Sequence, residues 1–358
     1  MTINREKTKS LDETPVIECQ NLWKVYAKNQ VDIDSVVSQK LDKDSALEGH
    51  KAVVAVGNAS FQVFRGETFC IMGLSGSGKS TLVRHINRLI EPSAGKIFVN
   101  GIDVGGLPPK DLRELRSTSI GMVFQNMALF PNRLVRDNIT FGLEMRNESL
   151  DRRREVVGDM LSLVQLEGWG DRYPSELSGG MQQRVGLARA LAADPDILLM
   201  DEPFSALDPL IRRQLQDQFL EIYSKLNKTS LFITHDLDEA IRMGDRIAIM
   251  KDGELVQIGQ PNEIILNPVD DYVKAFVGGV SRLKLLSAVT VMKPVESNLQ
   301  DVTSFDDYPR VDADCSLDKL MEVIISNDQP VAVTNESGKL IGTITARNLL
   351  EAIVDTKH

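Results

Sequence analysis

The sequence predicts an α/β fold, with a mostly parallel sheet covered by helices, followed by a small α+β unit. Two observations predict the first unit: short buried strands alternate with helices, and a glycine-rich loop joins one such strand to the helix that follows it. The second unit is predicted by a change in composition past Gly278-Gly279. From about Leu285 the chain is acidic and contains a compact pattern of short helices and strands. A chain of 358 residues also has the length of about two domains.

Each element of the first unit follows from its own pattern. Apolar runs of strand length end at turn signals, and longer runs of helix-forming residues lie between them. Asn100-Gly101 and Asp252-Gly253 predict tight hairpin turns, because both residues of such a turn need positive φ. The expected strands are Glu67–Met72, Lys96–Val99, Ile120–Phe124, Ile197–Met200, Leu231–Thr234, Arg246–Lys251 and Glu254–Ile258, and the expected helices are Ser80–Leu89, Arg152–Gln165, Met181–Ala193, Leu210–Leu226 and Leu237–Met243.

Charge and cysteine content exclude several classes of protein. A formal net charge of -10 argues against a nucleic-acid partner, since neutralising phosphates needs clustered Lys and Arg. The three cysteines, Cys19, Cys70 and Cys315, are too far apart for a metal or redox pair and odd in number for a disulfide framework, so a reducing cytosol is expected. Neither an apolar leader nor a run of about 18 apolar residues occurs, and residues 1–14 are expected to form a disordered tail.

The stretch Gly73–Ser80 (GLSGSGKS) has the spacing of a loop that wraps the phosphates of a nucleotide. Its glycines tolerate the φ values that turn successive N–H groups inward, Lys79 supplies a positive charge toward the β- and γ-phosphates, and the Ser80 hydroxyl can ligate Mg²⁺. The helix that follows would present its N-terminus to the phosphates. The expected nucleotide-binding residues here are Gly73, Ser75, Gly76, Gly78, Lys79, Ser80 and Thr81.

Two acids end the strand that begins at Ile197. Asp201 lies at the carboxyl edge of the predicted sheet, where it can hold Mg²⁺ through water, and Glu202 is adjacent. Because successive side chains of a strand point in opposite directions, the two carboxylates should have different roles. We expect Glu202 to polarise the water that attacks the γ-phosphate.

A second phosphate-binding helix N-terminus is predicted at Ser178, Gly179 and Gly180, just before a strong helix former. One triphosphate needs a single such site, and this chain has two. A head-to-tail dimer resolves this, because the second site of one chain can close over the nucleotide held by the first site of its partner.

The order of these motifs resembles the nucleotide-binding subunit of ATP-binding-cassette (ABC) transporters over about Val16 to Gly278. The resemblance implies a P-loop NTPase cassette over residues 15–280, in which a RecA-like core carries an antiparallel β subdomain and a helical subdomain, with ATP and Mg²⁺ as cofactors. It also assigns roles to further residues. Tyr26 stacks on adenine, Gln125 contacts Mg²⁺ and the catalytic centre, Gln182 belongs to the signature with Ser178, Asp208 to the D-loop, and His235 senses the γ-phosphate.

An insertion at residues 27–51 and several further stretches resemble the importers of glycine betaine, proline betaine, choline and related quaternary amines. This resemblance implies a second copy of the chain, integral membrane permease subunits and an extracytoplasmic substrate-binding protein as partners. It places the chain peripherally on the cytoplasmic face of the bacterial inner membrane. Met127–Val135 is the expected docking surface for the permease.

Two other functions stay open. One is the ATPase of an ABC transporter for another solute, such as an amino acid or another amine. The other is a soluble ABC ATPase of DNA repair or translation, but such proteins usually carry two cassettes or a long coiled coil between the P-loop and the signature. Lys79 to Leu177 holds no sustained heptads, and one cassette is present.

The C-terminal residues 285–358 resemble a single or truncated cystathionine-β-synthase (CBS) regulatory module. The expected elements are a helix at Leu317–Ser326, strands at Val331–Thr334 and Leu340–Thr345, and a helix at Arg347–Val354. Where the family's motif has an aspartate that binds ribose, this chain has Asn348, which cannot accept two hydroxyl bonds as a carboxylate would. Regulation and a structural role in pairing two chains both remain open for this domain.

Overall fold

The chain divides into two compact units, residues 1–274 and 275–358. The computed structural model describes residues 14–278, 287–294 and 308–354, apart from Asn126, Ala206, Asn227, Asp328 and Glu336. The predicted tail, residues 1–14, lies outside the described residues except for its last residue.

A six-stranded sheet forms the centre of the first unit, in the order β10-β9-β3-β8-β7-β6. Five of its strands run parallel and β10 pairs antiparallel at one edge. Its central strands β3, β8 and β7 are buried at every position, as expected for a sheet covered on both faces. The strands are β3 (Thr68–Met72), β6 (Ile120–Val123), β7 (Ile197–Asp201), β8 (Thr229–Thr234), β9 (Arg246–Lys251) and β10 (Glu254–Gly259).

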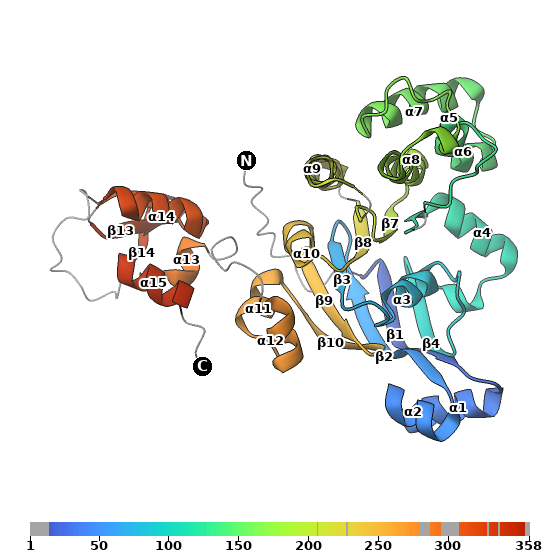
Figure 1. The fold of residues 1–358 in the computed structure, drawn as a ribbon, viewed down its shortest axis with the longest axis horizontal. Helices are drawn as coiled ribbons and strands as arrows, with labels where there is room; N and C mark the ends of the chain where they lie inside the picture. Colours follow the sequence, from blue (N-terminus) through green and yellow to red (C-terminus); the bar gives the residue numbers. More distant parts are fainter. Residues whose placement is uncertain are drawn as a thin grey trace. The chain divides into compact units, whose positions relative to one another are not determined.

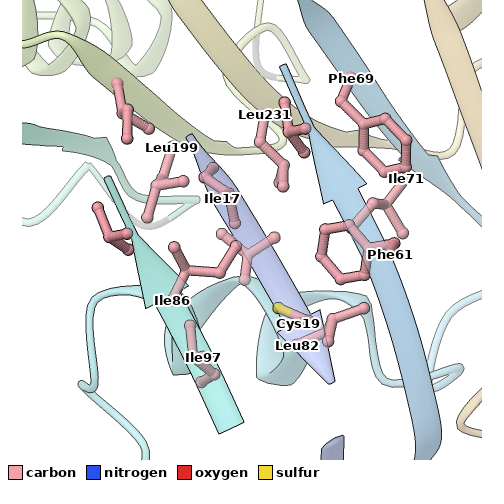
Figure 2. Close-up of a cluster of buried hydrophobic side chains, with 14 of the residues drawn as sticks. Ile17, Cys19, Phe61, Phe69, Ile71, Leu82, Ile86, Ile97, Leu199 and Leu231 are labelled. Atoms are coloured by element: carbon pink, nitrogen blue, oxygen red, sulfur yellow. The ribbon is translucent and has the colours of Figure 1, made fainter. Parts of the chain in front are cut away.

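A second sheet, antiparallel and in the order β2-β1-β4-β5, packs against the first unit's centre. Its strands are β1 (Ile17–Tyr26), β2 (Val53–Val63), β4 (Ala94–Val99) and β5 (Ile102–Asp103). The turn between β4 and β5 has positive φ at both Asn100 and Gly101, as the sequence predicts. Figure 2 shows the apolar core that joins this sheet to the parallel sheet, with Phe61 stacked on Phe69 at 5.4 Å between ring centroids and Ile17 close to Leu199 and Leu231.

Helices surround the parallel sheet, and one group forms a layer with a core of its own (Figure 1). This group packs Val135, Ile139, Leu161 and Val185 together, and its helix α8 also packs against β6 of the parallel sheet. The helices of the layer are α5 (Val135–Ile139), α6 (Phe141–Met145), α7 (Leu150–Leu163) and α8 (Gly179–Ala192). The others are α3 (Lys79–Ile86), α4 (Pro109–Thr118), α9 (Pro209–Leu226), α10 (Leu237–Met243), α11 (Pro261–Leu266) and α12 (Asp271–Val277), with short 3-10 turns at Val104–Gly106 and Pro174–Glu176.

The insertion at residues 27–51 folds as two short helices, α1 (Gln30–Gln39) and α2 (Lys43–His50), at one end of β1 and β2 (Figure 1). Asn29 and Asp42 cap them by accepting from backbone N–H groups, and each helix ends at a lysine in the left-handed conformation. Val36 and Ala46 bury their side chains against Trp23 and Val54.

The second unit contains a four-stranded sheet in the order β11-β14-β13-β12 and three helices among its described residues. These elements are α13 (Ala288–Val291), β11 (Lys293–Pro294), β12 (Arg310–Asp312), α14 (Leu317–Ser326), β13 (Val331–Thr334), β14 (Leu340–Ile344) and α15 (Ala346–Val354). Both expected helices and both expected strands are present. Leu317, Leu320, Val333 and Ile344 lie in its apolar core. No helix among the described residues of either unit has the length and hydropathy needed to cross a membrane.

Candidate active site

The glycine-rich loop joins the end of β3 to the start of α3, as the sequence predicts. Gly78 has a φ of 100°, and a Cβ built there would lie 2.0 Å from the carbonyl oxygen of Ala55 on β2. A Cβ at Gly73 would lie 2.2 Å from the carbonyl oxygen of Met250 on β9. The backbone of two neighbouring strands therefore leaves room for glycine alone, and the loop can curve tightly enough to turn its N–H groups inward.

Lys79 lies inside the curve of this loop. Its Nζ donates to the carbonyl oxygens of Gly73 and Leu74, at 2.8 Å each, and the side chain is buried. Burial lowers the pKa of Lys79, while the nearby carboxylates of Glu202 and Asp201 act in the opposite direction. Both acids are thus close enough to act on the charge that would face a nucleotide's phosphates.

Ser80 and Asp201 meet directly, as expected for two ligands of one Mg²⁺. Ser80 Oγ donates to Oδ1 of Asp201 at 2.8 Å, and Asp201 is fully buried at the end of β7. Arg84, one turn further along α3, donates to the other carboxylate oxygen at 3.0 Å. A hydroxyl and a carboxylate oxygen side by side fit Mg²⁺, which prefers hard oxygen ligands and takes few of them from the protein.

Glu202 lies between two of the predicted catalytic residues. Its carboxylate accepts a hydrogen bond from Nε2 of Gln125 at 3.2 Å, and its other oxygen is 3.4 Å from Nδ1 of His235. Its backbone is in the left-handed region, with a φ of 50°. A glutamate in this region is uncommon, and such backbone conformations cluster at functional sites.

The D-loop lies beside this group. Asp208 caps α9 by accepting from the N–H of Ile211, and Arg212 donates to the carbonyl oxygen of Leu207. Arg212 also contacts Asp236, the residue after His235, at 3.4 Å. A hollow is lined here by Glu202, Phe204, Ser205, Arg212, Thr234, His235, Asp236 and Glu239.

The predicted signature residues begin α8. Ser178 is the N-cap and accepts from the N–H of Met181 at 3.3 Å, while Ser178 and Gly179 are exposed. Gly180 follows in the first turn of the helix. Gln182 donates to the carbonyl oxygens of Pro174 and Leu177, so its amide holds the preceding segment of the same chain.

Tyr26, the predicted adenine contact, ends β1 with 49% of its surface exposed. The ammonium of Lys24 lies 4.9 Å from its ring centroid. The remaining predicted residues of the loop, Ser75, Gly76 and Thr81, are exposed or partly exposed.

Three residues that the sequence analysis did not single out hold the site in place. Arg84 pairs with Asp201, Gln183 donates to the carbonyl oxygen of Glu202 at 3.0 Å, and Arg189 donates to carbonyl oxygens of the segment after Gln125. Gln183 is the last residue of the predicted signature Leu177–Gln183, but its type gives no signal of this contact, because a glutamine in a helix is ordinarily exposed.

In the second unit, Asn348 caps α15. Its Oδ1 accepts from the hydroxyl of Thr345 at 2.7 Å and from the N–H of Thr345 at 3.2 Å, and Asn348 donates its own N–H to the hydroxyl. Thr345, just before α15, and Asn348, in its first turn, therefore satisfy each other's polar groups reciprocally, as in a capping box.

Comparison with known proteins agrees with this geometry. A sequence model of the family described as ABC transporter matches residues 56–205, and one of the CBS domain matches residues 300–355. The glycine betaine/carnitine transport ATP-binding protein GbuA of Listeria monocytogenes is 43% identical, over 94% of this chain and 97% of that protein. The trimethylamine N-oxide transport system ATP-binding protein TmoW of Pelagibacter ubique is also 43% identical, over 95% of this chain and 97% of that protein.

The dimeric ATP-binding cassette MJ0796, solved in a post-hydrolysis state with ADP and phosphate, is 30% identical. It aligns with a TM-score of 0.60, over 68% of this chain and 98% of that structure. The chain belongs to the ATP-binding subunits of ABC transporters, and it carries a C-terminal CBS domain. The predicted fold class is confirmed, and the chain is an ATP-binding, ATP-hydrolysing subunit of a transport system.

Proposed function

We propose that this chain powers the import of glycine betaine, proline betaine or choline-type osmolytes by hydrolysing ATP on the cytoplasmic face of the membrane. The observation that carries the proposal is the 43% identity to GbuA along 97% of that protein's length, which includes both units. Permease subunits and an extracytoplasmic binding protein would complete the transporter, since the described part of this chain offers no membrane-crossing helix.

The proposed chemistry assigns one role to each group of side chains. Lys79 and the N–H groups of the loop bind and orient the phosphates, and Ser80, Asp201 and Gln125 would hold Mg²⁺. Bound Mg²⁺ would offset the charge on the β- and γ-phosphates. The Glu202 carboxylate accepts a proton from the attacking water, in an orientation fixed by Gln125 and His235.

Hydrolysis in this proposal needs two copies of the chain. Ser178 and Gly179 are exposed at the start of α8, where backbone N–H groups and the helix dipole favour an anion. A two-fold dimer brings this helix N-terminus over the nucleotide held by the partner's Lys79, with Asp208 at the shared interface. The dimeric form of MJ0796 supports the pairing of two cassettes.

The expected docking surface for the permease, Met127–Val135, has a firm internal frame. The fully buried Asn138 donates to the carbonyl oxygens of Phe130, Arg133 and Leu134 and accepts from the N–H of Phe130. The guanidinium of Arg133 lies over the rings of Phe130 and Phe141. A partly exposed aromatic and arginine surface of this kind is typical of protein interfaces.

Uptake by proteoliposomes that contain the chain, its membrane subunits and its binding protein tests the proposal. We expect ATP-dependent uptake of labelled glycine betaine, with competition by proline betaine or choline. Glycine is the matched control solute, because it lacks only the three methyl groups that make the nitrogen quaternary. The Glu202→Gln protein should reduce ATP turnover and uptake on the order of 10²-fold.

Three results would contradict parts of the proposal. Uptake of labelled glycine but not of labelled glycine betaine would assign the transporter to another class of solute. Uptake of labelled trimethylamine N-oxide but not of labelled glycine betaine would place it with the TmoW relatives. Normal turnover in the Glu202→Gln protein would remove Glu202 as the general base.

A further inference from the structure

Arg189, near the C-terminal end of α8, holds the segment that follows Gln125. Its Nη2 donates to the carbonyl oxygen of Met127 at 2.8 Å and its Nη1 to that of Ala128 at 2.6 Å. Burial lowers the pKa of this guanidinium, which nevertheless stays charged near neutral pH. Two carbonyl dipoles thus meet a partly buried charge.

The two residues that Arg189 contacts have an unusual backbone. Met127 and Ala128 are consecutive, and both lie in the left-handed region, with φ values of 50° and 48°. Neither is a glycine, so this turn persists only where surrounding contacts fix it. Arg189 contacts both residues of the turn, and the turn begins two positions after Gln125.

Helix α8 also contacts the backbone of Glu202, the hydrogen-bond partner of Gln125. Gln183 is 1% exposed, and its Nε2 donates to the carbonyl oxygen of Glu202 at 3.0 Å. Glu202 has a left-handed backbone as well. Gln183 and Arg189 are separated by only about 9 Å along the helix axis, so one rigid element fixes the backbone on both sides of the Gln125 to Glu202 hydrogen bond.

Resting on the roles given above to Gln125 and Glu202, we propose that α8 is the element that positions this pair, with Arg189 and Gln183 as its positioning residues. Arg189 fixes the turn that closely follows Gln125, and Gln183 fixes the backbone of Glu202. Because Ser178 is the N-cap of α8, any displacement of the helix at this end must move both residues together. Engagement of the signature by a partner's nucleotide therefore changes the geometry of the general base in the same chain.

Arg184 supplies a matched control on the same helix. It too is an arginine whose pKa is lowered by burial, and its Nη1 donates to the carbonyl oxygens of Val164 and Gln165, at 3.1 Å each. Gln165 is left-handed, with a φ of 55°. Arg184 therefore makes the same kind of contact, but to the end of α7 rather than to the segment after Gln125.

The test compares Arg189→Met with Arg184→Met in the full-length protein, by amide hydrogen exchange and by ATPase kinetics. The N–H of Met127 bonds to Phe124 and that of Phe130 to Asn138, so these two amides report on the segment. We expect Arg189→Met to raise their exchange on the order of 10-fold and to lower kcat on the order of 10-fold with KM for ATP within about 2-fold. Arg184→Met should leave both quantities near the wild-type values.

Each alternative result decides the proposal. Wild-type exchange in Arg189→Met, or an equal loss of kcat in Arg184→Met, would overturn the positioning role, and so would faster exchange with an unchanged kcat. If Arg189→Met does not fold, Gln183→Leu replaces it, with the same loss of kcat expected at unchanged KM. A wild-type protein without ATPase activity would instead count against the proposed function, and the exchange comparison would still report on the contact itself.

Discussion

At the residue scale, a buried histidine gives the first unit a dependence on pH that its active site does not explain. His85 on α3 is fully buried, its Nδ1 lies 2.5 Å from the carbonyl oxygen of Thr81, and its Nε2 has no hydrogen-bond partner among the described residues. Burial lowers the pKa of His85 from 6.5 to about 4. The folded state therefore favours the neutral ring.

The sign of the effect on stability follows from proton binding. Between pH 6.5 and 4 the unfolded chain binds a proton that the folded chain excludes, so stability is complete above pH 6.5 and falls as the pH falls toward 4. His85→Gln removes this contribution. We expect the difference in unfolding free energy between the wild type and His85→Gln to change over that range by on the order of 3 kcal/mol.

Urea unfolding at a series of pH values measures this difference. Trp23 and Trp169 are the two tryptophans of the chain and both belong to the first unit, so their fluorescence reports on that unit alone. Parallel stability profiles for the two proteins would show that His85 titrates normally in the folded state.

Prediction from the sequence succeeded where the chemistry depends on local spacing. The loop around Lys79 was predictable because glycines, lysine and serine must follow one another closely to contact one phosphate chain. The contacts of Arg84, Gln183 and Arg189 were not predictable, because their partners are distant in the sequence, and two of the three bond to backbone carbonyls. A carbonyl carries no residue identity, so no pattern of residue types marks such a pair.

At the element scale, two glycines of the glycine-rich loop distinguish two ways in which an added side chain lowers the free energy of unfolding, namely backbone strain and steric overlap. Gly78 combines a φ of 100° with a Cβ position 2.0 Å from the carbonyl oxygen of Ala55, whereas Gly76 has a φ of 79° and no atom within 4 Å of its Cβ position. Gly76→Ala should cost only the backbone strain, about 1–2 kcal/mol. Gly78→Ala should cost more than about 3 kcal/mol, because β2 or the loop must also shift.

Urea unfolding and binding of a fluorescent ATP analogue measure the two variants. We expect Gly78→Ala to lose nucleotide binding because the displaced loop no longer directs its N–H groups inward. Equal losses of stability in Gly76→Ala and Gly78→Ala would mean that the contact with Ala55 does not shape the loop.

The two inserted helices show why some elements escaped prediction. The sequence marked residues 27–51 as an insertion, and the cap residues Asn29 and Asp42 were visible in it. The two helices are short, however, and few of their residues are buried. Helices of this length depend on packing against the rest of the fold, here on Trp23 and Val54, and a sequence pattern does not reveal such packing.

At the scale of the whole molecule, each of the two units has an apolar core of its own. The apolar clusters described around the two sheets, in the helical layer and under the insertion contain no residue beyond Ile258, and the cluster of the second unit begins at Ala288. The amide oxygen of Asn348 is used in the cap of α15, which favours a role for this unit other than the binding of a ribose at that position.

Removal of the chain after Gly278 tests what the second unit contributes. Because the cores of the cassette lie before this point, we expect the truncated protein to keep its basal ATPase activity within about 2-fold at low salt. In the intact chain, the second unit carries more acidic than basic residues. Any effect of this charge on the cassette must weaken as salt screens it. The Debye length falls from about 10 Å at 0.1 M salt toward 3 Å at 1 M. ATPase rates of both proteins across this range of ionic strength measure the effect. A regulatory second unit requires the two salt responses to differ, whereas superimposable curves with equal basal rates would restrict this unit to a structural role such as pairing two copies of the chain.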